Sequence, residues 1–436
     1  MDSKRPLARA TLSLPAQIRR LRLQAAEQLT DLDEACRAFG QILFQYEPSW
    51  LKEGFNLAPA SMPFDAFAHP AARPIFDHLH GVFNDSLPDG WGLLLMVRAF
   101  KQHKQLDPAQ ITPLDRLAYL GNRCMGALTY QPDLMPSVQT QAMDLVALAK
   151  ASMAVIRGEA AQVLESLRIH GGSPGGARPK ITLAFSADMK YCQSSYVDLP
   201  ENLSHWMVKF RDDSPVHGEP IDTGRVEMAY AQMARAAGLE IPKTHLLELT
   251  VNGTKEAYFA VQRFDREGRQ KIHALSLAGY AYANHRLPSL DYAGGVLPAT
   301  KKLTQSNAEL ARAFRLMVFN VFAHNKDDHS KNFAYLMDPV HGAWKLSPAF
   351  DLTFNHGMNG QHTTSINGTG EPSFEDIKQV AIKSRIENWR SVIEEVRAGV
   401  ARWAEFASQC DVGASRTKDI ARALQGVDQR TSQGRF

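Results

Sequence analysis

Cysteine is scarce in this chain of 436 residues. The four cysteines, Cys36, Cys124, Cys192 and Cys410, lie far apart and form neither a C-x-x-C pair nor a zinc-binding spacing. A disulfide scaffold is therefore not indicated, and the pattern favours buried thiols in a reducing compartment.

Long hydrophobic runs are also lacking. No apolar stretch approaches the roughly 18 residues that a membrane-spanning helix needs. The first residues, MDSKRPLARATLSL, lack the apolar core of a signal peptide. The sequence thus predicts a cytoplasmic protein with no membrane partner.

Charge of one sign is not in excess. The 49 Lys and Arg residues nearly balance the 46 Asp and Glu residues, which leaves a formal net charge of +3. Such a balance supplies no overall attraction for nucleic acid, so direct DNA binding is not indicated. Because 44% of the residues are hydrophobic, the chain can bury a large core, and we expect two or three packed subdomains.

Hydrophobic patterning divides the chain into three regions. Residues 1–135 mix strand-like runs at 41–46 and 127–130 with helical patterns at 90–104 and 114–119, as in an α+β subdomain. Residues 136–268 carry helical patterns and strand patterns in a mixed order. The helices are expected at 143–157, 160–167 and 224–238, and the strands at 181–185, 206–210, 245–251 and 257–262.

The third region, residues 269–436, is mostly helical. Helices are expected at 307–322, around Ile377 to Ile382, and from Ile386 to Trp403, where apolar residues recur at spacings of three and four. The polar end holds a short helical piece at 418–424 and is expected to fray. A strand-rich region followed by a helical one is typical of the two lobes of a kinase. The predicted fold class is α+β, a two-lobed protein-kinase-like fold with an N-terminal α+β subdomain and a mostly helical C-terminal lobe.

A polar cluster at 327–332 supplies a candidate catalytic loop. Asp327 and Asn332 have the D-x-x-x-x-N spacing in which a kinase Asp accepts the substrate hydroxyl proton and the Asn holds Mg²⁺. About one such pair is expected by chance in a chain of this length. An apolar run at 333–337, a turn at 338–342 and a second run at 343–346 predict a hairpin that brings Asp351 back to this loop. Asn332 and Asp351 can then share an ion that takes oxygen ligands.

A glycine-rich segment at 171–176 is a candidate phosphate loop. Small residues let backbone N–H groups approach an anionic phosphate chain closely. The segment does not match the G-x-x-x-x-G-K-[ST] pattern of a P-loop, and an ordinary turn is the alternative interpretation.

Lys209 lies in an apolar strand pattern and Glu227 in the following helix. A strand lysine paired with a helix glutamate orients the lysine toward the nucleotide phosphates in kinases. The alternatives are a solvent-facing lysine and an exposed first-turn glutamate that favours the helix dipole. Residues 260–264 fit a strand edge whose backbone can bond adenine, with Phe264 as ordinary core packing the alternative.

A different chemistry also fits the catalytic-loop region. His324, Asp327, Asp328 and His329 crowd together, and such clusters also form the metal sites of hydrolases and nucleases.

Several ordered motifs point to one family. The run D-D-H-S-K-N at 327–332, Phe350-Asp351, and G-G-A-R-P-K at 175–180 after Ser173 resemble the HipA family of bacterial serine/threonine kinases, which are the toxins of type II toxin–antitoxin pairs. The stretches FNDSLPDGWG (83–92), LAYLGNRCMGAL (117–128) and AVQRFDR (260–266) extend the resemblance over nearly the whole chain. The resemblance implies a kinase that uses ATP and Mg²⁺.

The resemblance assigns roles to individual residues. Asp327 would be the catalytic base, Asn332 and Asp351 the metal ligands, and Ser173 an autophosphorylated serine whose modification weakens ATP binding. ATP would be bound by Gly175, Gly176, Ala177, Arg178, Pro179, Lys180, Lys209, Gln262, Arg263, Phe264, His329, Ser330, Lys331, Asn332, Phe350 and Asp351. Asp328 occupies a position where some family members carry glycine.

The resemblance also implies partners. Family members are neutralised by a small HipB-like helix-turn-helix antitoxin, contact operator DNA through that complex, and phosphorylate translation components such as aminoacyl-tRNA synthetases. An inactive kinase-fold corepressor that acts with an antitoxin is the alternative within the same family. The implied regions are an N-terminal HipA-type subdomain (1–135), a small-lobe-like region with the glycine-rich loop, ATP lysine and hinge (136–268), and a helical lobe with the catalytic loop (269–436).

Overall fold

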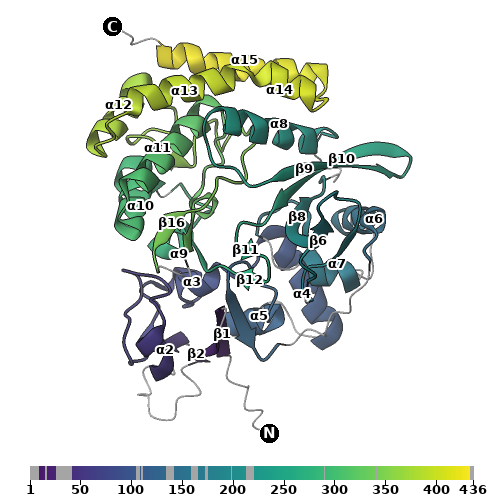
Figure 1. Cartoon of the computed structure of the whole chain (residues 1–436), viewed down its shortest axis with the longest axis vertical. Helices are drawn as coiled ribbons and strands as arrows, with labels where there is room; N and C mark the ends of the chain where they lie inside the picture. The colour runs from purple at the N-terminus through teal and green to yellow at the C-terminus, as the bar shows by residue number, and fades with distance from the viewer. Residues whose placement is uncertain are drawn as a thin grey trace.

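The computed structural model describes most of the chain. The described residues are 9–14, 17–25, 42–104, 109, 111–133, 142–158, 165–171, 175–197, 199–212, 220–288, 290–338 and 342–432. The elements α2, β1 and β2 lie at one end of the molecule and the C-terminal helices α12 to α15 at the opposite end, and the strands β6, β8 and β10 lie between them (Figure 1).

The first sheet is formed by five strands in the order β4-β3-β2-β1-β5. Its strands are β1 (Arg9–Leu14), β2 (Gln17–Ala25), β3 (Ile42–Gln45), β4 (His69–Pro70) and β5 (Leu128–Gln131). Helical elements accompany the sheet: α2 (Pro48–Glu53), η2 (Pro74–Phe76), α3 (Gly81–Asn84), α4 (Gly90–Lys104) and α5 (Pro113–Leu120). Helix α5 begins where Thr112 and Asp115 cap each other's backbone N–H groups, as a capping box. The sequence anticipated β3, β5, α4 and α5 but not β1 and β2.

The second sheet is antiparallel and has the order β7-β6-β8-β10-β9. It contains β6 (Lys180–Ser186), β7 (Cys192–Ser194), β8 (Leu203–Lys209), β9 (Thr244–Val251) and β10 (Thr254–Gln262). The accompanying helices are α6 (Leu145–Ile156), α7 (Glu165–Gly171) and α8 (Thr223–Ala236). Helix α8 packs against β9 and β10 on one side and against the C-terminal helices on the other. It therefore joins this sheet to the helical lobe.

The remaining chain forms small sheets and a helical layer. The short strands are β11 (Arg266–Glu267), β12 (Gln270–Lys271), β13 (Ala274–Ser276), β14 (Leu290–Asp291), β15 (Ala334–Met337), β16 (Trp344–Leu346) and β17 (Thr364–Ser365). The helices are α9 (Leu277–Ala281), the π-helix η4 (Tyr292–Val296), α10 (Leu297–Thr304), α11 (Asn307–Phe322), the 3-10 turn η5 (Ser330–Asn332), α12 (Phe374–Lys383), α13 (Trp389–Ala401), α14 (Trp403–Gln409) and α15 (Ala414–Ser432). The predicted hairpin after the catalytic loop is present as the antiparallel pair β15 and β16.

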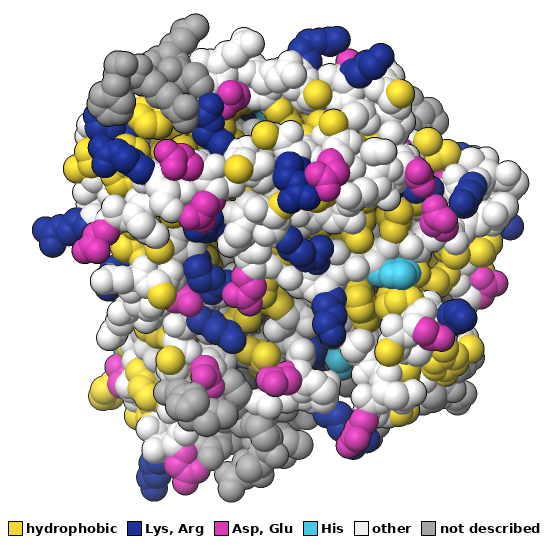
Figure 2. Space-filling model, turned by 45° about the horizontal axis from the view of Figure 1, so that its top comes forward, with side chains coloured by type: hydrophobic (Ala, Val, Ile, Leu, Met, Phe, Trp, Pro, Cys, Tyr) yellow, Lys and Arg dark blue, Asp and Glu magenta, His cyan; other side chains and the backbone are white. Residues whose placement is uncertain are grey.

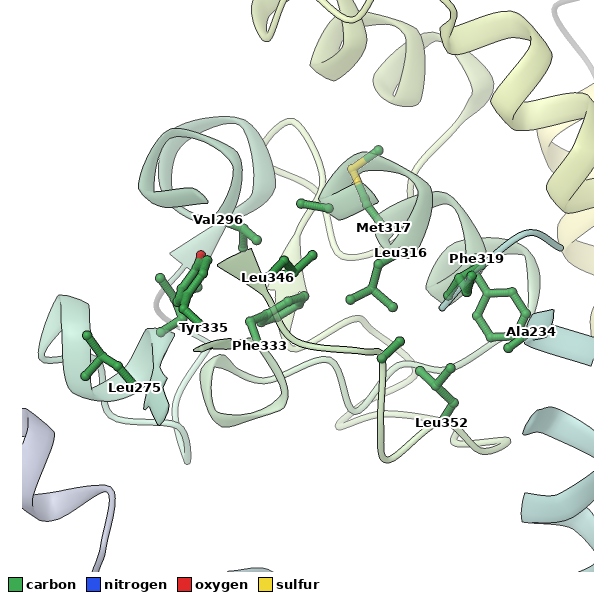
Figure 3. Close-up of a cluster of buried hydrophobic side chains, with 14 of the residues drawn as sticks. Ala234, Leu275, Val296, Leu316, Met317, Phe319, Phe333, Tyr335, Leu346 and Leu352 are labelled. Carbon is green, nitrogen blue, oxygen red and sulfur yellow. The ribbon is translucent and has the colours of Figure 1, made fainter. Parts of the chain in front are cut away.

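A buried core lies beneath this hairpin. Side chains of α8, β13, η4, α11, β15 and β16 converge there, and Leu352 joins them (Figure 3). Leu352 directly follows Asp351 and is 8% exposed. Its burial anchors the backbone at Asp351, whose φ of 57° is a left-handed conformation that aspartate tolerates better than bulkier residues.

Two expectations for the C-terminal helices were wrong. The single helical pattern from Ile386 to Trp403 is interrupted at Arg402, which separates α13 from α14. The end of the chain forms the 19-residue helix α15 rather than a short helical piece at 418–424. Ile420, Leu424 and Val427 explain this difference, because their spacing buries one face of α15 against the helical layer. The predicted fraying concerns the last residues, and 433–436 lie outside the described residues.

Charged side chains of both signs are interspersed on the face of the molecule in Figure 2, without a broad field of one sign. None of the described helices is both long and apolar enough to cross a membrane.

Candidate active site

Lys209 stands at the centre of a buried ionic cluster. Its Nζ lies 3.1 Å from Glu227 Oε2 and also contacts Asp351 Oδ1. Lys209 is 6% exposed and Glu227 3% exposed, so the alternatives of a solvent-facing lysine and an exposed glutamate are wrong. Strand β8 supplies the lysine, the first turns of α8 supply the glutamate, and the segment after β16 supplies the aspartate.

Lys209 and Asp351 in this cluster each stabilise the ionised form of the other. Burial acts to lower the pKa of Lys209, but the carboxylates of Asp351 and Glu227 outweigh it and the pKa is raised. The Lys209 ammonium in turn holds the pKa of Asp351 well below its usual range, against the opposing effect of desolvation. The Asp351 side chain keeps 41% of its surface exposed, so crowding by neighbours does not close it off from solvent. It is an ionised carboxylate that a ligand can reach.

The glycine-rich loop approaches the same cluster. Arg178 forms an ion pair with Glu227, and its Nε donates to the carbonyl of Phe210 over 3.1 Å. Gly176 has a φ of 95°, a backbone conformation in which a side chain is strained. Glycine is therefore favoured at this position. Ser173 lies outside the described residues.

Lys180 faces Lys209 across the pairing of β6 and β8. Its Nζ donates to the carbonyl of Gly175 over 2.5 Å. Burial lowers the pKa of Lys180 to about 8, and the neighbouring Lys209 adds to this effect while Asp351 opposes it. Lys180 and Lys209 therefore place two positive charges close together beside the glycine-rich loop.

The candidate catalytic loop presents Asp327 to solvent. Asp327 is exposed, whereas the adjacent Asp328 is 1% exposed. Crowding around Asp327 raises the pKa of its carboxyl despite its open surface, and the charge of His329 opposes this rise while those of Asp351 and Asp328 add to it. Asn332 Nδ2 donates to the Asp327 carbonyl over 2.8 Å, which turns the Asn332 amide oxygen away from that carbonyl.

Asp328 anchors the candidate catalytic loop to buried neighbouring residues. Its carboxylate accepts a hydrogen bond from the Tyr292 hydroxyl at 2.9 Å, contacts His362 Nδ1 at 3.0 Å, and accepts from the Thr364 N–H at 3.2 Å. The Asp328 carboxylate therefore faces the interior.

The predicted hydrolase cluster is not assembled. His324 stacks on Phe354 and its Nδ1 lies 3.1 Å from the Asn355 carbonyl, while Asp328 faces the interior. Among the residues that the structure describes, no three His, Cys, Asp or Glu side chains are arranged to hold a metal ion.

The strand edge at 260–264, which was predicted to bind adenine as a hinge, differs in part from expectation. The N–H groups of Gln262 and Arg263 donate to the carbonyls of Lys243 and His205, at 2.8 and 2.9 Å. Any backbone contact of these two residues with a base must use their carbonyls. The Arg263 guanidinium is buried against Asp265, with Nη2 2.7 Å from Oδ2, so this side chain has a structural role. Phe264 packs on Phe350, with ring centroids 5.3 Å apart, and so links the hinge to the segment of Asp351.

Asp89 is a site residue to which the sequence assigned no role. It precedes α4, contacts Lys331 and His285, and accepts a hydrogen bond from the Gly176 N–H. His285 lies beside His329, with ring centroids 5.5 Å apart. The only sequence signal for Asp89 was its place in the FNDSLPDGWG stretch.

The residues present fit a nucleotide and a divalent cation. An amide oxygen of Asn332 and a carboxylate oxygen of Asp351 are the hard ligands that Mg²⁺ prefers. Lys180, Lys209 and Arg178 surround the same space with positive charge suited to phosphates.

Comparison with known proteins gives consistent matches. The family described as HipA-like C-terminal domain matches residues 172–404, and the family described as HipA N-terminal domain matches residues 27–131. A protein of Sinorhizobium fredii (strain NBRC 101917 / NGR234) named "Putative kinase Y4dM" is 26% identical over 194 residues, which are 41% of this chain and 46% of that protein. This chain thus spans about half the length of that relative.

Solved structures show the fold. The structure described as Shewanella oneidensis MR-1 toxin–antitoxin system HipA, HipB and its operator DNA complex has a chain that superposes with a TM-score of 0.65. The superposition covers 97% of both chains at 15% sequence identity. The Helicobacter pylori proinflammatory kinase CtkA superposes with a TM-score of only 0.32, at 12% identity over 56% of this chain and 95% of that one. The first superposition confirms the predicted α+β, kinase-like fold class.

Proposed function

Because this chain belongs to the HipA family, we propose that it is a serine/threonine protein kinase that transfers the γ-phosphate of ATP to a protein hydroxyl. One observation carries the proposal: the buried strand lysine Lys209 bridges Glu227 on α8 and Asp351 beside the catalytic loop. This pairing orients a lysine toward nucleotide phosphates in kinases.

In the proposed mechanism, Lys209 and Lys180 bind one side of the phosphate chain. The loop from Gly175 to Pro179 covers the opposite side. Glu227 keeps Lys209 and Arg178 extended toward the nucleotide, since it pairs with both. Fixed cations stabilise the charge that develops during transfer. Phe264 and Phe350 supply apolar surface for the base.

Asp327 orients the attacking hydroxyl and accepts its proton. The raised pKa of this carboxyl makes it a better proton acceptor than a free aspartate. Asn332 and Asp351 would hold Mg²⁺, which when bound neutralises the charge on the β- and γ-phosphates. His329, Ser330 and Lys331 line the loop between these groups.

The proposed biological role is that of a toxin. We propose that Ser173 is autophosphorylated and that the added charge opposes the ATP phosphates. A HipB-like antitoxin, operator DNA contacted through it, and a translation component as substrate are proposed partners; the Shewanella structure contains HipB and operator DNA. The proposed site of action is the cytoplasm.

The test compares wild type with Asp327→Asn, and uses Asp419→Asn on the exposed face of α15 as a matched control. Wild type should bind a non-hydrolysable ATP analogue only with Mg²⁺, and its mass should rise by one phosphate located on Ser173 by peptide mapping. Asp327→Asn should keep nucleotide binding but lose about 10²–10⁴ in rate, because the general base is removed. Asp419→Asn should match wild type.

Three results would contradict the proposal or part of it. Failure of wild type to bind Mg²⁺ and nucleotide would overturn the kinase assignment. Binding without phosphoryl transfer to any protein would support the inactive corepressor. Transfer to another protein with an unmodified Ser173 would remove only the autophosphorylation.

A further inference from the structure

Residues at the start of α4 form hydrogen bonds with the glycine-rich loop at Gly176. The Asp89 carboxylate accepts a hydrogen bond from the Gly176 N–H, and the Trp91 N–H donates to the Gly176 carbonyl over 3.1 Å. Gly90 lies between them with a φ of 45°, and a Cβ there would lie 2.5 Å from Ala177 Cα. The N-terminal subdomain thus holds both polar groups of one loop residue and packs against the next.

The same carboxylate also binds the catalytic loop. Asp89 Oδ2 lies 2.7 Å from Lys331 Nζ and 3.2 Å from His285 Nε2. The Asp89 side chain is 14% exposed, so these contacts are shielded from water. They hold the pKa of Asp89 well below its usual range, against the effect of burial. One ionised side chain therefore connects two loops that lie far apart in the sequence.

This connection matters because a phosphate loop acts through its position. Phosphoryl transfer depends on fixed donors and cations, and small displacements of these groups lower the rate. A glycine-rich segment has little intrinsic preference for one conformation. An ammonium group has three N–H donors, so Lys331 can bind Asp89 and still offer donors to a phosphate.

Building on the proposed kinase function, we propose that Asp89 is a positioning residue that fixes the glycine-rich loop against the catalytic loop. The N-terminal subdomain is then a structural part of the nucleotide site, although Asp89 does not take part in the chemistry.

Three variants separate the components of this contact. Asp89→Ala removes the contacts with Gly176, Lys331 and His285. Asp89→Asn keeps the side-chain shape and one acceptor, and Gly90→Ala pushes the loop away without changing charge. Asp144→Ala is the control, because Asp144 caps α6 through Val146 N–H and Ala147 N–H and its loss destabilises the protein elsewhere.

We expect Asp89→Ala to weaken binding of Mg²⁺ with AMP-PNP by about tenfold or more, since a charge-assisted hydrogen bond is lost. Asp89→Asn should have a smaller effect, and Gly90→Ala should weaken binding without a change in net charge. The KM for ATP should rise more than the KM for a protein substrate. In ligand-free protein, peptides that cover residues 175–180 should exchange amide hydrogens faster in Asp89→Ala than in Asp144→Ala.

Unchanged exchange at 175–180 together with wild-type nucleotide affinity in Asp89→Ala and Gly90→Ala would overturn the inference. Equal losses in Asp144→Ala would also overturn it, because the effect would then be one of general stability. If wild type binds no nucleotide, the kinase proposal fails, and the exchange measurement still decides whether Asp89 holds the loop.

Discussion

At the scale of single residues, the candidate site brings several fixed cations together with carboxylates. Lys180, Lys209 and Arg178 contribute cations, while Glu227 and Asp351 contribute carboxylates. Cations held in fixed positions by buried carboxylates suit a phosphate ligand, because charge-assisted hydrogen bonds to phosphate oxygens are strong.

Glu227→Gln should disturb both stability and nucleotide binding. The change removes the shared partner of two buried cations, and breaking a buried pair costs about 3–5 kcal/mol. Without Glu227, Lys209 keeps its contact with Asp351, so we expect it to turn toward that carboxylate and away from the phosphates. Chemical denaturation and titration with a Mg²⁺-bound ATP analogue measure the two effects.

The matched control for this change is Glu375→Gln, which removes an exposed pair with Lys378. That variant should show no measurable loss of either property, because surface pairs contribute little. If Glu227→Gln were as stable and as tight in nucleotide binding as this control, the ionic cluster would have no functional role.

At the scale of secondary-structure elements, the candidate catalytic loop depends on three elements that pack against its buried side. Asp328 accepts from Tyr292 of η4 and Thr364 of β17. The Tyr292 hydroxyl also accepts from Asn320 of α11 over 3.1 Å. The buried Asp328 therefore locks the backbone of the loop, which leaves the adjacent Asp327 free to face solvent. Asp328 thus acts as an anchor for the candidate catalytic loop.

Tyr292→Phe should lower activity through this support. The variant leaves the buried Asn320 donor without its partner and takes one donor from Asp328, at a cost of about 1–3 kcal/mol. We expect kcat to fall severalfold, much less than in Asp327→Asn, with little change in the KM for ATP. Steady-state kinetics and thermal unfolding together measure this outcome.

Tyr335→Phe is the control for this prediction. The Tyr335 hydroxyl is also buried and pairs with Thr300 Oγ1 at 2.9 Å, away from Asp328. Tyr335→Phe should lower the free energy of unfolding by an amount similar to that in Tyr292→Phe, while keeping the wild-type kcat. Equal kcat values in the two variants would show that the network behind the loop has no catalytic effect.

At the scale of the whole molecule, buried histidines make stability depend on pH. Burial lowers the pKa of His80, His170 and His273 to about 4, from an ordinary value of 6.5. Between these values the unfolded chain binds protons that the folded chain excludes, so stability is present above pH 6.5 and is lost as the pH falls toward 4. Asp85 acts in the opposite sense, because burial raises its pKa to about 6. Three histidines outweigh one aspartate.

The free energy of unfolding should therefore decrease between pH 7 and pH 5, by roughly 1–2 kcal/mol for each buried histidine. Denaturant titrations at several pH values test this. His273→Gln keeps a donor for the Leu57 carbonyl, which lies 2.9 Å from the imidazole Nε2, but it cannot titrate. This variant should show a shallower dependence on pH than wild type, and an identical slope would exclude His273 as a contributor.

Local patterns in the sequence determined many of the elements. The apolar face of α11, the hairpin of β15 and β16, and the strand that carries Lys209 all follow from periodicities of a few residues. The D-x-x-x-x-N spacing identified Asp327 and Asn332, and the η5 turn brings the Asn332 amide to the Asp327 carbonyl. Strands β1 and β2 and the break at Arg402 were missed, since pairing partners and packing decide them.

The tertiary structure alone decided which distant groups meet. The sequence paired Lys209 with Glu227 as a hypothesis, but only the packing of α8 on the sheet decided that Glu227 is buried and shared with Arg178. No pattern linked Asp89 to Gly176 and Lys331, which follow it by 87 and 242 positions. Such contacts depend on how whole layers pack, and periodicity along the chain carries no record of that arrangement. Sequence therefore determined the elements and the chemical types of the candidate site residues, while packing decided their partners and charge environment.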